Sequence, residues 1–164
     1  MSVIIRKVRT ALQREYRKAG GIRVDEAIAQ AGQNLETLSA QCAERIDAAI
    51  AEIIEMTTDP HRQPTAEELR TLHALVNEIL ACCATVEIEG LVDTLYALGR
   101  LVGALMATDA WLDGALTPAV NLLRLVRRGA IAPEDLKALV AGVDQCAHRI
   151  STHTRLAGVL SGKR

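Results

Sequence analysis

Paired carboxylates are the first groups in this sequence whose types and spacing could do chemistry. Glu52 and Glu55 lie one helical turn apart, and Glu87 and Glu89 are separated by a single residue. Such pairs transfer protons when a histidine or a nucleophile lies within reach, or hold two iron ions when further helices supply matching ligands. Neither pair has these neighbours at helical spacing. The sequence therefore favours a protein that is not an enzyme, and it assigns no catalytic residue and no cofactor.

Cysteine and histidine residues come next, because they could bind a metal ion or form disulfides. The four cysteines are Cys42, Cys82, Cys83 and Cys146. Cys146 and His148 face different sides of a helix, and the step from His148 to His153 also misses a common face. A metal site would have to join distant segments, such as those of Cys42 and Cys82, so we expect none. Without a CxxC pair a disulfide framework is not expected either, which favours a reducing, cytoplasmic compartment.

His73 is the residue with the most specific potential role. It lies at the edge of the apolar stripe of its expected helix, with Arg70 one turn before it and Asn77 one turn after it. This spacing resembles the phosphoacceptor helix of bacterial sensor-kinase dimerisation domains and histidine phosphotransfer proteins, although the acidic neighbour usual in the kinases is Ala74 here. The resemblance implies that His73 accepts a phosphoryl group in two-component signalling. The alternative is a structural histidine at the boundary of the core.

The charges of the chain are unevenly distributed. Residues 1–23 contain seven bases and one acid, residues 24–123 contain four bases and sixteen acids, and residues 124–164 contain eight bases and three acids. The net charge of −1 conceals this asymmetry. Two basic ends around an acidic middle indicate either complementary surfaces within the protein or binding surfaces for an anionic partner.

The basic start of the chain is expected to be an amphipathic helix over residues 3–18, ended by Gly20 and Gly21. We expect it to dock on the acidic middle of its own chain or of a second chain. Binding to an anionic membrane surface or to nucleic acid is a less favoured alternative. The chain has few aromatic side chains on which bases could stack, and its isoelectric point is about 6.4.

The overall composition predicts an all-α fold. The chain of 164 residues contains 26 alanines and 21 leucines but no phenylalanine, whereas strands favour β-branched and aromatic residues. Arginine outnumbers lysine 15 to 4, which is typical of a GC-rich bacterial genome. No apolar run is long enough for a secretory signal or a membrane-spanning helix.

The apolar spacing predicts one helix much longer than the others, over residues 24–57. Its stripe advances by alternating steps of four and three residues, which is the spacing of a coiled-coil core. The members of this stripe are Val24, Ile28, Ala31, Leu35, Leu38 and Cys42. Shorter helices are expected to begin at a capping box at Thr65, near Leu91, at Thr117 and near Pro133.

These patterns together predict a single domain over residues 1–164, folded as an up-and-down bundle of about five helices around the 24–57 helix. A proline-containing linker is expected over 58–65 and a frayed tail over 158–164. We expect a homodimer through the long helix or through a ridge formed by Gly99 and Gly103. The function that fits best is a non-enzymatic, cytoplasmic protein-interaction module whose partner the sequence does not identify. The phosphotransfer role of His73 is the alternative.

Overall fold

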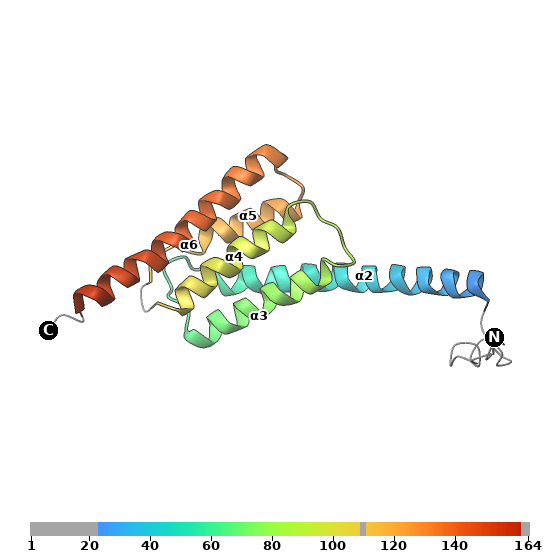
Figure 1. The fold of residues 1–164 in the computed structure, drawn as a ribbon, viewed down its shortest axis with the longest axis horizontal. Coiled ribbons are helices and arrows are strands. Elements are labelled where there is room, and N and C mark those ends of the chain that lie inside the picture. The colour runs from blue at the N-terminus through green and yellow to red at the C-terminus, as the bar shows by residue number, and fades with distance from the viewer. Residues whose placement is uncertain (1–22, 109–110, 162–164) are drawn as a thin grey trace, which may run out of the picture. The chain divides into compact units, whose positions relative to one another are not determined.

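The computed structural model describes residues 23–108 and 111–161 of the chain, the last nine of them by their backbone alone. Within this part every regular element is a helix, which confirms the all-α prediction (Figure 1). The helices are α2 (Val24–Met56), α3 (Ala66–Cys82), α4 (Leu91–Met106), α5 (Thr117–Arg127) and α6 (Pro133–Ser161). The expected basic helix over residues 3–18 lies outside the described residues. Helix α6 extends to Ser161, into the expected tail.

The chain divides into two compact units, Met1–Thr37 and Leu38–Arg164. The described residues of the first unit are 23–37, which form the beginning of α2. The second unit contains the remainder of α2 and the four other helices. The single domain expected from chain length stays a prediction.

Helix α4 occupies the centre of the second unit. It packs against α3, α5 and α6, and its buried side chains include Leu95, Leu98, Leu101 and Val102. A helix that contacts neighbours on several sides needs apolar residues around most of its circumference, and among the described helices α4 has them. The sequence predicts a bundle built around the long helix α2, but α2 contributes buried side chains only from Ile46 onwards.

A capping box fixes the beginning of α3, as the sequence predicts. The Thr65 hydroxyl accepts a hydrogen bond from the Glu68 amide at 3.2 Å, and the Glu68 carboxylate accepts one from the Thr65 amide at 2.8 Å. These bonds satisfy two amides that a helix start otherwise leaves unpaired. The bond from Thr65, and next the bond from Arg62, lower the pKa of the Glu68 carboxyl.

Three arginine–carboxylate pairs connect neighbouring helices of the second unit. They join α2 to α3, α2 to α5 and α4 to α6, and they are Arg45–Glu78, Asp47–Arg127 and Arg100–Asp144. In each pair a guanidinium nitrogen lies 2.6 to 2.8 Å from a carboxylate oxygen. Because the pairs are at the surface, where water and salt screen the charges, each contributes little to stability. The bond from Arg127 also lowers the pKa of the Asp47 carboxyl.

The ridge formed by Gly99 and Gly103 on α4 does not bring a described neighbouring backbone close. A Cβ atom added to Gly99 would meet Val76 Cγ1 at 3.6 Å, which is an ordinary van der Waals distance. At Gly103 no described atom lies within 4 Å of such a Cβ. The spacing between α3 and α4 is therefore set by side chains such as Val76 rather than by contact between backbones.

Candidate protein-interaction surfaces

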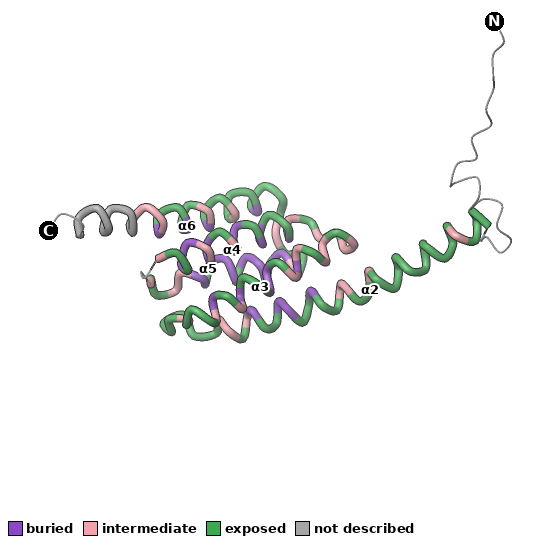
Figure 2. Tube along the Cα trace, turned by 60° about the horizontal axis from the view of Figure 1, so that its bottom comes forward, coloured by how far each residue is buried: buried purple, intermediate pink, exposed green. Residues whose placement is uncertain are grey.

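The first candidate surface is the apolar stripe at the beginning of α2, formed by Val24, Ile28, Ala31 and Leu35 and called the α2 stripe below. The stripe has coiled-coil spacing, and the sequence predicts a homodimer through this long helix, so the exposure of the stripe in a single chain bears on that prediction. Val24 is 75% exposed, Ile28 67% and Leu35 58%. Figure 2 shows exposed residues along this part of α2 and buried residues only towards its end. An exposed row of large apolar side chains on a soluble protein marks an interaction surface.

Most of the charged residues of this part of α2 lie away from the stripe. Residues 24–44 contain four acids and no base. At 100° per residue, Glu26 lies on the opposite side of the helix and Glu36 lies well to one side. The positions that flank the stripe carry small or neutral residues, among them Ala27, Gly32 and Asn34. Asp25, adjacent to Val24, lies at the edge of the other side of the stripe. The beginning of α2 is thus an apolar ridge with a neutral border on one side, Asp25 on the other and an acidic back.

The second candidate surface is an apolar groove between α5 and α6, called the α5–α6 groove below. It has a volume of about 450 Å³, and its walls are almost entirely apolar. Leu125 on α5 and Leu139 on α6 stand at its sides and remain 40% and 46% exposed. The other residues lining it are Pro118, Asn121, Leu122, Ala138, Gly142, Val143 and Cys146.

Leu125, Leu139 and Cys146 were expected in the core, because they continue the apolar stripes of their helices. The structure shows that all three are exposed and line the groove. The reason is that α5 and α6 both pack on α4 and touch each other less. The α6 wall includes Ala138 and Gly142, whose small side chains leave space, and a Cβ added to Gly142 would meet no described atom within 4 Å.

Basic residues predominate on the two helices around the groove. The first turn of α6 contains two acids, Glu134 and Asp135. Arg124 lies beside the groove, since its guanidinium donates to Oδ1 of Asn121 at 3.3 Å. Among the side chains that the structure describes, Arg124 on α5 and Lys137 and Arg149 on α6 are bases outside the interhelical ion pairs, and Arg128 directly follows α5.

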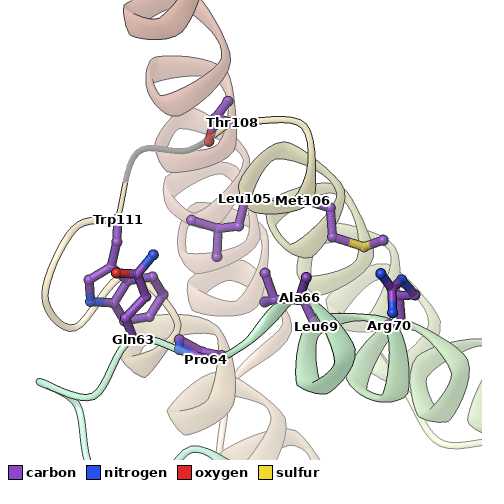
Figure 3. Close-up of a pocket in the computed structure, with 9 residues that line it drawn as sticks. All are labelled: Gln63, Pro64, Ala66, Leu69, Arg70, Leu105, Met106, Thr108 and Trp111. Atoms are coloured by element: carbon purple, nitrogen blue, oxygen red, sulfur yellow. The ribbon is translucent and has the colours of Figure 1, made fainter.

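A smaller pocket of about 230 Å³ lies between the first turns of α3 and the end of α4, where Trp111 covers one side (Figure 3). Trp111 is half-buried and packs against the core. Its Nε1 atom is buried, and no described residue accepts a hydrogen bond from it. Arg70 at the rim of the pocket forms an ion pair with Glu67.

His73 is exposed on α3, with Asn77 beside it, as the sequence predicts. The Nδ2 atom of Asn77 donates a hydrogen bond to Nδ1 of His73 at 3.1 Å. A neutral ring that accepts at Nδ1 carries its proton at Nε2. Attack by Nε2 on a phosphoryl group would therefore require the oxygen of the Asn77 amide, rather than its nitrogen, to face the ring.

Cysteines lie on both sides of the contact between α2 and α3, but the described residues contain no group of three or more side chains that could hold a metal ion. Burial raises the pKa of the Cys83 thiol. Burial, and then a hydrogen bond with Cys42, raises the pKa of the Cys82 thiol. A raised thiol pKa disfavours the thiolate that metals and electrophiles need. Cys42 and Cys82 thus lie within hydrogen-bond distance of each other, in surroundings that favour the neutral thiols.

The structure also brings together one histidine–carboxylate pair that the sequence analysis did not consider. His61 Nδ1 lies 3.3 Å from Asp113 Oδ2, and both side chains are largely exposed. The two residues come from loops far apart in the chain, so their spacing in the sequence carries no signal. A backbone bond from the Gly114 amide to the Pro60 carbonyl, at 2.7 Å, also joins the two loops.

None of the described helices has the length and apolar content that crossing a membrane requires.

Comparison of the chain with protein-family models, with curated proteins and with solved structures gave no match.

Proposed function

We propose that this protein is a non-enzymatic helical interaction module that binds another protein helix through the α2 stripe, and that a second copy of the chain is its partner. The observation that carries this proposal is the exposure of Val24, Ile28 and Leu35 at coiled-coil spacing on one continuous helix. In proteins most helical stability comes from packing an apolar face. Burial in a partner would contribute about 1 to 2 kcal/mol for each large side chain of the stripe.

The proposal predicts that Leu35→Asp prevents self-association and leaves the fold intact. An aspartate at this exposed position costs the monomer little, but in an apolar contact it must lose its water. We expect the dimer dissociation constant to rise at least about 100-fold, which corresponds to about 2.7 kcal/mol. Sedimentation equilibrium at tens of micromolar measures the association, and circular dichroism measures the helical content.

Leu112→Asp is the matched control, because Leu112 is 60% exposed and belongs to neither candidate surface. This variant should associate as the wild-type chain does. A wild-type chain that sediments as a monomer, or a Leu35→Asp chain that remains dimeric, would refute the proposed function.

The second candidate function is phosphotransfer at His73, which is favoured by the exposure of this ring on a helix packed against α4. Incubation with a phosphorylated response-regulator receiver domain should then place acid-labile phosphate on the wild-type chain. The label should disappear in His73→Gln and persist in His148→Gln, a histidine exposed on another helix. A wild-type chain without label would rule out this function.

A further inference from the structure

We infer that the α2 stripe of one copy docks in the α5–α6 groove of a second copy, and that the second copy returns the same contact. This inference rests on the proposed function and adds the surface that receives the stripe. It joins two apolar surfaces that are exposed in the described residues, the stripe with Leu35 and the groove with Leu125 and Leu139.

The shapes of the two surfaces are complementary. Ile28, Ala31 and Leu35 follow one another at positions i, i+3 and i+7, which is how an amphipathic helix presents side chains to a groove. A groove between two helices encloses such a ridge from two sides, so a short helix buries more of each side chain there than against one helix. Gly32 borders the ridge with open space around it, and Gly142 opens the α6 wall of the groove. Backbone can therefore approach backbone closely at these positions.

The charges of the two surfaces are also complementary. The helix that carries the stripe has four acids and no base over residues 24–44. On α5 and α6, Arg124, Lys137 and Arg149 lie outside the interhelical ion pairs, Arg128 directly follows α5, and the acids outside these pairs are Glu134 and Asp135. Attraction between the acidic part of α2 and this region of net positive charge favours association, most strongly at low salt. Pairing two stripes directly would instead bring two acidic helices together over a short length.

The exchange closes the assembly at two copies. Each chain has one stripe and one groove, so a two-fold axis satisfies both surfaces of both chains. Two equal contacts then hold the dimer. If one variant is damaged in the stripe and another in the groove, a mixture of the two still has one intact stripe and one intact groove, which can form one contact. A dimer in which the two stripes pair with each other does not predict this rescue.

The test uses the full-length chain with Leu35→Asp in the stripe, Leu139→Asp in the groove and Leu112→Asp as the control. Leu139 is 46% exposed, so its replacement tests the groove with little cost to the fold, which circular dichroism verifies. We expect sedimentation at tens of micromolar to show a dimer for the wild type and for Leu112→Asp, and monomers for the other two variants. An equimolar mixture of Leu35→Asp and Leu139→Asp should form a heterodimer, because the intact stripe of one fits the intact groove of the other.

The heterodimer should be weaker than the wild-type dimer, since it keeps one contact of two, and its dissociation constant should rise with salt concentration. If Leu35→Asp is monomeric but Leu139→Asp remains dimeric, the stripes pair with each other; the proposed function then stands and the inference about the groove is overturned. If both variants are monomeric and their equimolar mixture is also monomeric, the reciprocal exchange is overturned. A monomeric wild type overturns the inference together with the proposed function.

Discussion

Leu98→Ala should lower the free energy of unfolding by about 3 kcal/mol, since replacing a fully buried leucine by alanine removes apolar contacts and leaves a cavity. Leu98 is fully buried on α4, the helix that contacts three neighbours. Movement of one neighbouring helix cannot fill the cavity, because helices on several sides of α4 keep their positions. Urea unfolding followed by circular dichroism measures this loss as a shift in the midpoint with an unchanged slope.

The control is Leu112→Ala, which removes the same atoms from a side chain that is 60% exposed. Its effect should stay within about 0.5 kcal/mol, as for most surface substitutions. Similar losses for the two variants would contradict a core centred on α4.

Gly90→Ala should destabilise the protein by about 3 kcal/mol, of which about 1 is backbone strain and the rest is overpacking. Gly90 precedes α4 with φ at +74°, a conformation that alanine adopts with strain. A Cβ atom would also lie 2.0 Å from Cδ2 of Leu136 and 3.2 Å from its Cγ. Leu136 is itself buried, so it cannot move aside without disturbing its neighbours. The measurement is again the free energy of unfolding in urea.

Gly129→Ala separates these two contributions. Gly129 has φ at +62°, but a Cβ there would meet no described atom within 4 Å. We expect a loss of about 1 kcal/mol from strain alone. Leu136→Ala should also remove most of the overpacking at Gly90. The loss in free energy of unfolding for the double variant Gly90→Ala/Leu136→Ala should therefore be smaller than the sum of the losses for the two single variants. Strict additivity would show that Gly90 and Leu136 do not meet.

The helices themselves could be predicted from the sequence because their signals are local. The capping box at Thr65, the steps of three and four along the stripes and the proline near the beginning of α5 act within one or two helical turns. The same steps correctly identified the buried residues of α4, such as Leu95 and Leu98. They failed for Leu125 and Leu139, which have the correct spacing but are exposed.

The candidate surfaces could be predicted only in part. An apolar stripe shows that a helix has a face to bury, and this was clear for the beginning of α2. Whether another helix of the chain covers that face depends on contacts between segments far apart in the sequence. The pairing of His61 with Asp113 illustrates the same limit, since two loops meet there without any pattern that links them. Exposure of His73, by contrast, followed from its position at the edge of a stripe.

The sequence by itself determined that the chain is helical, where α2 to α6 begin and end to within a few residues, and which side of each helix is apolar. Only the tertiary structure decided that α4 lies at the centre of the second unit, and that the α2 stripe and the α5–α6 groove remain open. The physical reason is that helix formation depends on neighbours within a turn, whereas burial depends on the volume available between helices. Side chains such as Val76 and Gly142 set that volume, and their effect is felt only once the helices have packed.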